Sequence, residues 1–430
     1  MYITNIEIRN IRCFQEIRIP VESNGKPCLW TTFLGDNGTG KTTLMRSIAM
    51  GLCDKADYSG LLQEIYGDWI SKGPWMDGKK REATIRIVFI THDLQEKRFI
   101  ETTIEEKKPG NFEFEQKTGP TDFPWQDIFV CGYGAGRRAF GSTDYPAYFS
   151  VDAFYTLFNY ETRLQNPELI LHRVKDYAGV NIEDVLNRVS DILMLEKNSV
   201  KLTMTGIEVK GPWGEFRPLG ALGDGYQATL AWIVDMFGWA MFYDNQMIKS
   251  ELTGIVLLDE LEQHLHPKWQ RQIISLLKKQ FPKMQFISTT HSPLIAANAG
   301  KLSEDDPQAR LFHLSYDSET GNKISEVEER LAELDLDQIL SSEAFDYIPD
   351  PSSRAEAILR EASILAGKGS DRTPEENERY EKVLAVIKQL KFPEGQSVIE
   401  REAERKHFED LVEQSKKLRE LLVRESYDKD

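Results

Sequence analysis

The sequence of 430 residues has few cysteines, no long apolar run and no targeting segment at its start. Its four cysteines, Cys13, Cys28, Cys53 and Cys131, are isolated beside apolar runs and lack metal-ligand spacing, which favours reduced core residues. No apolar stretch approaches the length of a bilayer span, and the first residues lack the basic start and apolar core of a secretion signal. We therefore expect a cytoplasmic protein with no membrane association.

Basic residues are also in the minority, and the formal net charge is −16. This balance argues against a surface covered in DNA-binding residues, because phosphate contacts require clustered Lys and Arg. A local basic patch stays possible. The chain also has no internal repeat and no low-complexity linker, and its length suits one elaborated nucleotidase domain with an appendage.

A glycine-rich phosphate loop is the strongest motif. The segment GDNGTGKTT at residues 35–43 fits the pattern GxxxxGK[ST] and lies between an apolar run and a helical run. A chance glycine-rich turn is the weaker alternative. In such a loop Lys41 reaches the β- and γ-phosphates of a nucleoside triphosphate, and the Thr42 hydroxyl can ligate Mg²⁺. The expected nucleotide-binding residues are Asp36, Asn37, Gly38, Thr39, Gly40, Lys41, Thr42 and Thr43.

A second motif is the segment GIVLLDELEQHLHP at residues 254–267. Its apolar residues predict a buried strand that delivers Asp259 and Glu260 to its carboxyl end, where ligands bind in open α/β sheets. Asp259 can hold Mg²⁺, directly or through water, and Glu260 can polarise the attacking water as a general base. Two acids after an apolar run are weak evidence alone, but strong evidence downstream of a phosphate loop.

Two further segments complete the candidate site. The strand in QFISTTHSP, residues 285–293, ends near His291, which we interpret as a catalytic γ-phosphate sensor; the alternative is a structural histidine. The segment LGDGYQ, residues 222–227, precedes a long helix and offers free amides to an anion at Gly223, Asp224 and Gly225. In isolation this segment would be an ordinary helix start.

In order and spacing these four segments resemble the ABC-type ATPase head of SMC, RecF and related proteins, over about residues 1–320. More narrowly, DNGTGKTT, GYGAGRR, GDGYQ and DELEQHLHPKWQR resemble the compact AAA-type ATPases of prokaryotic antiphage systems. Among these families they resemble Septu PtuA, with the PARIS ATPase AriA and the OLD-like ATPases as near relatives. The resemblance implies ATP and Mg²⁺ as cofactors, sandwiched between two heads, and therefore a homodimer or a higher symmetric oligomer.

The predicted fold is α/β, with a mostly parallel sheet, because near-continuous apolar strands at 254–258 and 285–289 are separated by helices. Alternating residues predict a hairpin at 2–20 and antiparallel strands at 83–93 and 98–107. A strand pair, 200–209 and 216–219, precedes a helix from 226 to about 243. The expected divisions are the N-terminal part of the ATPase head (1–150), a helical insertion (151–200), the rest of the head (201–320) and a helical region (321–430).

Some residues fit the resemblance poorly or admit two interpretations. The signature serine is replaced by Gly223, which removes a hydroxyl from the γ-phosphate and implies slow hydrolysis. Gln63 is either the glutamine-loop residue or a surface residue. Arg137 and Arg138 belong either to an anion-binding loop or to a structural loop with solvated arginines. His264 and His266 are interpreted as residues that shape the loop facing the other protomer; the alternative is a metal site, which a lone pair without a nearby cysteine does not favour.

The resemblance implies a sensor and scaffold of antiphage defence that controls a separate effector nuclease of HNH or TOPRIM type. The chain lacks the clustered histidines of an HNH site, and the DxD spacing of Asp335 and Asp337 lies in a helical pattern. The alternative is a RecF-like repair ATPase that binds DNA, which requires a basic surface between the heads. A transporter ATPase is a third possibility, disfavoured by the altered signature.

Overall fold

The computed structural model describes the chain as one compact unit over residues 1–333 and a second unit over 334–430. The described residues are 1–55, 69–93, 95–137, 147–177, 180–244, 252–300, 309–317, 319–328, 330–334, 336–340 and five single positions beyond. Of the second unit, one short helix, α10 (Leu336–Leu340), is described. Gln63, Arg138 and nearly all of the predicted C-terminal helices lie outside these residues.

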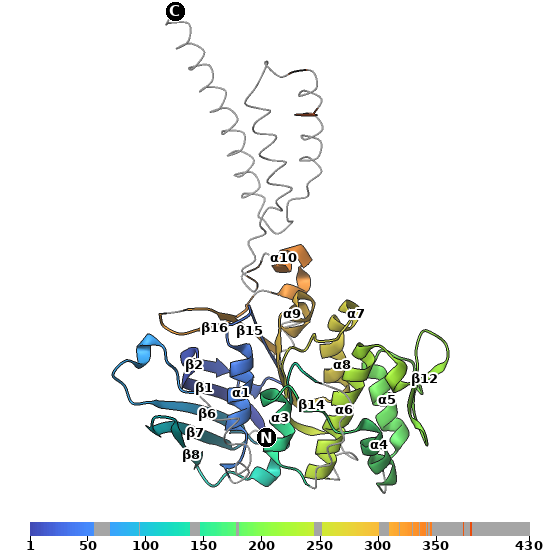
Figure 1. Ribbon diagram of the computed structural model, residues 1–430, viewed down its shortest axis with the longest axis horizontal. Helices are drawn as coiled ribbons and strands as arrows, with labels where there is room; N and C mark the ends of the chain where they lie inside the picture. Colours follow the sequence, from blue (N-terminus) through green and yellow to red (C-terminus); the bar gives the residue numbers. More distant parts are fainter. Residues whose placement is uncertain are drawn as a thin grey trace, which may run out of the picture. The chain divides into compact units, whose positions relative to one another are not determined.

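A six-stranded sheet forms the centre of the first unit (Figure 1). All neighbouring strands run parallel except the pair at one edge, β15 and β16. Residues in β5 and β14 are buried almost throughout, as expected for a sheet covered on both faces. The predicted α/β fold is therefore confirmed. In spatial order the strands are β16 (Lys323–Glu326), β15 (Ala309–Ser315), β5 (Trp30–Gly35), β14 (Lys283–Thr290), β13 (Thr253–Leu258) and β9 (Val130–Tyr133).

The second sheet is antiparallel and contains both the predicted hairpin and the predicted strand pair. Its order is β2 (Phe14–Pro20), β1 (Tyr2–Ile11), β6 (Glu82–Ile90), β7 (Lys97–Lys108) and β8 (Asn111–Gly119). The alternating isoleucines of β1 and β6 pair in register, Ile6 opposite Ile87 and Ile8 opposite Ile85, and all are fully buried. Helix α1 (Lys41–Gly51) contacts this sheet and the central one, so the helix that follows the phosphate loop lies between them (Figure 1).

The predicted helical insertion consists of α3 (Ser150–Phe158), α4 (Pro167–Asp176) and α5 (Ile182–Ile192). Asn166 and Asn181 cap the last two through side-chain oxygens, a common way to satisfy free helical amides. The prediction of one strand over 200–209 was wrong. The tight turn at Met204, closed by the Thr203 hydroxyl on the Gly206 carbonyl at 2.9 Å, divides it into β10 (Val200–Thr203) and β11 (Gly206–Lys210), which pairs with β12 (Phe216–Pro218).

Helix α6 (Asp224–Tyr243) begins within the predicted anion-binding segment, and α7 (Pro267–Gln270), α8 (Ile273–Gln280) and α9 (Pro293–Ala299) connect the later strands. The other described elements of the unit are the short strands β3 (Glu22–Ser23) and β4 (Lys26–Pro27) and the 3₁₀ helices η2 (Pro74–Met76), η3 (Trp125–Asp127), η4 (Leu219–Ala221) and η5 (Leu331–Glu333). Strand β16 was missed, because it lies in the region 321–430, which was predicted to be helical. Its four residues are too few for an alternation of apolar and polar side chains to be recognised, and the strand forms because it pairs with β15.

Candidate functional site

The phosphate loop connects the end of β5 to the start of α1. Residues 36–38 are exposed, which leaves this part of the loop open to a ligand. Gly40 adopts a left-handed backbone with φ 98°, and a Cβ there would lie 2.6 Å from Cys13 Sγ. Both the conformation and the contact require glycine. The local sequence therefore fixes the loop, since a bulkier residue at position 40 would push it away from the β1–β2 turn.

Lys41 points back into the loop and is buried, with 6% of its surface exposed. Its Nζ donates to the carbonyls of Gly35 and Asp36 at 2.7 and 2.9 Å. Burial lowers the pKa of Lys41, while the carboxylates of Asp259 and Glu260 act in the opposite direction. The ammonium group is thus held where phosphate oxygens would offer it stronger acceptors than two neutral carbonyls.

A chain of hydrogen bonds joins the phosphate loop to the end of β13. Thr42 Oγ1 donates to Asp259 Oδ2 at 2.8 Å, and Thr289 Oγ1 donates to Asp259 Oδ1 at 2.6 Å. Asp259 itself is 1% exposed. A hydroxyl and a carboxylate are the hard oxygen donors that Mg²⁺ takes beside phosphate oxygens and water, so this pair fits the expected metal. The fold thus brings together two residues that are 217 positions apart.

Glu260 follows Asp259 with a left-handed backbone, φ 49°, which is uncommon for a residue with a side chain. Its N–H donates to Thr289 Oγ1 at 2.8 Å. In the amide orientation that satisfies both of its polar atoms, Gln263 donates to Glu260 Oε2 at 2.7 Å. Burial, followed by the charges of Asp259 and Glu262, raises the pKa of Glu260. A half-buried carboxylate with a raised pKa has the properties of a general base.

His291 lies just beyond the end of β14, and its backbone N–H donates to Glu262 Oε1. The other oxygen of Glu262 accepts a bond from Thr290 Oγ1 at 2.9 Å. Burial and the charge of Lys41 lower the pKa of His291, which keeps its imidazole neutral at pH 7. Sequence reasoning did not single out Glu262 as an anchor. The only available signal was a third acid two residues after Glu260.

Arg137 is buried, which contradicts, for this residue, the alternative of a structural loop with solvated arginines. Its Nη2 donates to the carbonyls of Asp259 and Glu260, both at 2.6 Å, and its Nε donates to the Gly134 carbonyl at 3.1 Å. Burial lowers its pKa to about 10, so the group stays protonated at neutral pH. Nothing in the sequence around Arg137 indicated that its side chain would be buried.

The segment at Gly223 stands at the start of α6 without a side-chain cap. A Cβ at Gly223 would meet nothing within 4 Å, whereas one at Gly225 would lie 2.6 Å from the His264 carbonyl. Asp224 forms the first turn of the helix. The segment therefore packs beside the chain that follows Glu260, but no hydrogen bond between described residues joins it to Lys41 or Thr42.

Two histidines and four cysteines were also considered in the sequence analysis. His266 caps α7, with Nδ1 accepting from the Lys268 N–H at 3.2 Å. Within the described part of the chain, no group of three or more His, Cys, Asp or Glu is arranged for a metal ion. All four cysteines are free; Cys28, Cys53 and Cys131 are buried as predicted, whereas Cys13 is only partly buried. Among the helices that the structure describes, none has both the length and the apolar character needed to cross a bilayer.

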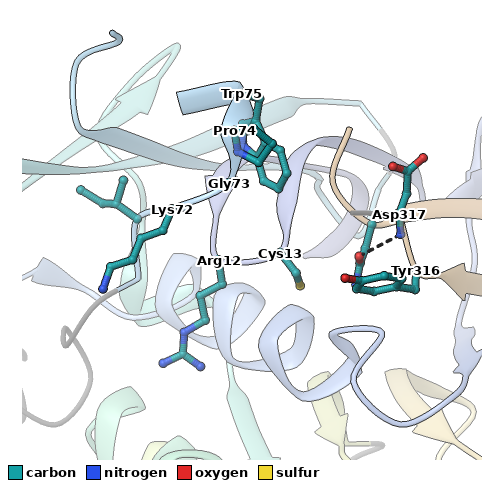
Figure 2. Close-up of a pocket in the computed structure, with 10 residues that line it drawn as sticks. Arg12, Cys13, Lys72, Gly73, Pro74, Trp75, Tyr316 and Asp317 are labelled. Carbon is teal, nitrogen blue, oxygen red and sulfur yellow. Dashed lines mark hydrogen bonds between the residues drawn. The ribbon is translucent and has the colours of Figure 1, made fainter. Parts of the chain in front are cut away.

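A pocket of about 360 Å³ lies beside the phosphate loop (Figure 2). Asn322 Nδ2, on its wall, donates to the Thr39 carbonyl at 2.8 Å, which ties the pocket to the loop. Figure 2 shows the Trp75 and Tyr316 rings on different sides of the pocket, with Arg12 between Lys72 and Cys13. The pocket thus combines two aromatic rings with two cations, a lining suited to the base and sugar–phosphate of a nucleotide.

Comparison with known proteins gives two family models that match separate parts of the chain. "AAA ATPase domain" matches residues 1–130, and "AAA domain, putative AbiEii toxin, Type IV TA system" matches residues 142–297. The head domain of an SMC protein from Thermotoga maritima aligns with 76% of this chain and 100% of its own, at 17% identity and a TM-score of 0.47.

Two curated relatives are similar in sequence. The Septu protein PtuA of Bacillus mycoides is 26% identical over 415 residues, 92% of this chain and 53% of its own length. The retron Vc95 probable ATPase of Vibrio cholerae is 60% identical over 71 residues, 16% of this chain and 14% of its own. The chain spans about half the length of the first relative. Two separate parts of the chain thus match ATPase-domain models, and most of its length is similar in sequence to the Septu protein PtuA.

Proposed function

We propose that the chain hydrolyses ATP in a site completed by a second copy of itself. The observation that carries this proposal is the hydrogen-bonded link from Thr42 through Asp259 to Thr289, which places the phosphate loop against the acidic end of β13. The segment at Gly223 stands apart from this link, with open space in front of it. A second protomer would bring its own Gly223 segment to the triphosphate.

In this proposal each residue of the site has a separate role in hydrolysis. Lys41 and the loop amides bind the triphosphate, and Thr42 with Asp259 would hold Mg²⁺, which neutralises charge on the phosphate oxygens when bound. Glu260 accepts a proton from the attacking water, as its raised pKa permits. Neutral His291 offers a hydrogen bond to the terminal phosphate. The pocket lined by Trp75 and Arg12 would take the nucleoside half of ATP.

The missing hydroxyl at position 223 predicts a gain of function. We expect Gly223→Ser to raise kcat several-fold, because a Cβ there meets nothing within 4 Å and the serine hydroxyl could bond the partner's γ-phosphate. The new hydroxyl would also cap α6, which is worth a few tenths of a kcal/mol over glycine. Phosphate release by both proteins at saturating ATP measures the effect.

Gly220→Ser is the matched control, because a Cβ at Gly220 also meets nothing within 4 Å and the residue lies three positions earlier. It should leave kcat at the wild-type value. A Gly223→Ser protein that hydrolyses ATP no faster than wild type would show that the glycine is not what limits turnover.

We further propose that the ATPase is the sensor and scaffold of an antiphage defence complex and controls a nuclease carried by another chain. Support comes from the similarity to the Septu protein PtuA over 92% of this chain. The net charge of −16 gives DNA binding by this chain itself little support.

Purification of the native protein with its bound partners, followed by mass spectrometry, tests the defence proposal. DNA binding by the isolated protein is measured in parallel at two salt concentrations. We expect a stably bound nuclease of HNH or TOPRIM type and negligible DNA affinity. Strong, salt-sensitive duplex binding without a partner would instead establish the RecF-like alternative, because affinity from phosphate contacts falls steeply with salt.

A further inference from the structure

We propose that Arg137 is a positioning residue for ATP hydrolysis, which holds the backbone at Asp259 and Glu260 so that the Glu260 carboxylate faces the terminal phosphate. The inference rests on the ATPase function proposed above. Arg137 does not touch the reacting atoms in this arrangement. It acts through the main chain of the two residues that do.

The first argument is the place of Arg137 between two strand ends. Strands β9 and β13 pair in parallel up to Tyr133 and Leu258, and the Asp259 N–H still bonds the Tyr133 carbonyl at 2.9 Å. Beyond that point the guanidinium replaces the strand-to-strand bonds. It binds the Gly134 carbonyl on one side and the carbonyls of Asp259 and Glu260 on the other.

The second argument is the backbone that Arg137 restrains. Glu260 has φ 49°, a conformation that a residue with a side chain adopts only where its surroundings impose it. Two contacts impose it here. The Thr289 hydroxyl accepts from the Glu260 N–H at 2.8 Å, and Arg137 donates to the Glu260 carbonyl at 2.6 Å. Without the arginine, the Glu260 carbonyl would lose the hydrogen bond that restrains it.

The third argument is that the hydrogen bonds of Arg137 go to backbone carbonyls and not to carboxylates. Among the ion pairs of the described chain segments, none joins Arg137 to a carboxylate, although Asp259, Glu260 and Glu262 are near enough to affect its pKa. Its hydrogen bonds go to carbonyls instead. Asp259 therefore keeps its oxygens for Thr42 and Thr289, and the Glu260 carboxylate stays available for water. This pattern suits a positioning role better than charge neutralisation.

The test uses the full-length protein with Arg137→Met, which removes the charged donor at similar length, and Arg137→Lys, which keeps the charge but loses the fork. The control is Arg310→Met, because the Arg310 side chain is only 14% exposed and donates to a carbonyl, that of Pro20 at 2.9 Å, outside the candidate site; unlike Arg137, it also pairs with Glu326 at 3.3 Å. Each protein is assayed for kcat, for binding of a fluorescent ATP analogue and for its melting temperature.

We expect Arg137→Met to lower kcat by tenfold or more while analogue affinity stays within about twofold of wild type, because misplacement of a catalytic group slows the chemistry without removing the phosphate contacts. Arg137→Lys should recover part of the rate, and Arg310→Met should retain all of it. A folded Arg137→Met protein with the wild-type kcat, or an equal loss of affinity and kcat, would overturn the proposal.

If Arg137→Met does not fold, Arg137→Lys decides the question: a threefold or greater loss of kcat at unchanged affinity supports the positioning role, and a wild-type kcat refutes it. Failure of the proposed ATPase function looks different, because then the wild-type protein itself would bind ATP without hydrolysing it.

Discussion

Lys41→Ala is expected to weaken ATP binding by more than about 100-fold, because it removes charge-assisted hydrogen bonds to two phosphates, worth roughly 3 kcal/mol or more together. The protein should nevertheless fold normally. Burial lowers the pKa of Lys41, so its charge is a cost to the free protein that the substitution removes. Titration with a fluorescent ATP analogue and a melting curve without nucleotide measure the two effects.

Trp75→Ala is measured in the same titration and should weaken ATP binding less than Lys41→Ala does. If the pocket beside the loop takes the base, loss of the ring should weaken binding by about tenfold, the value of one good stacking contact. Inorganic triphosphate, which has no base, should bind the Trp75→Ala protein as it binds wild type. For the first variant, an ATP affinity of the Lys41→Ala protein equal to that of wild type would show that the phosphate loop does not bind the nucleotide.

Glu260→Gln is expected to lower kcat by at least about 100-fold, the usual contribution of a general base. The amide matches the carboxylate in shape but cannot accept the proton of the attacking water. Nucleotide binding should persist, because Lys41 and the link from Thr42 to Asp259 are unchanged. The variant should therefore accumulate as an ATP-bound dimer, visible by light scattering in the presence of ATP and absent without it.

A glutamate remote from the site serves as control for this change. Glu101→Gln removes a carboxylate of β7 that pairs with Arg86 at 2.8 Å, and its kcat should equal that of wild type. Undiminished hydrolysis by the Glu260→Gln protein would contradict the assignment of Glu260 as the base. Loss of hydrolysis without a dimer would instead contradict the proposal that two copies complete the site.

Local spacing explains which features could be predicted from the sequence. The strand–loop–helix around Lys41 and the apolar strand before Asp259 are encoded within short windows, and both stand where they were expected. The fold class followed from them. Contacts between distant segments could not be predicted in this way. The burial of Arg137 depends on strands more than a hundred residues apart, and β16 exists only because it pairs with β15.

The anchoring role of Glu262 was hidden for a related reason. Its carboxylate receives bonds from Thr290 and from the backbone of His291, which stand nearly thirty residues further along the chain. Nothing in the segment after Asp259 distinguishes an acid that binds a neighbouring strand end from one that faces solvent. Contacts of this kind can be recognised only in the structure, where the two strand ends lie side by side.

The close fit of Gly225 against the His264 carbonyl has a consequence for communication between two bound nucleotides. Tyr226, the next residue, packs edge to face on Trp269 with ring centroids 4.7 Å apart. The start of α6 therefore cannot shift without disturbing the chain that follows Asp259 and Glu260. In the proposed dimer, one stretch of each protomer would sense both its own ATP and its neighbour's, so that hydrolysis at either site changes the fit at the other.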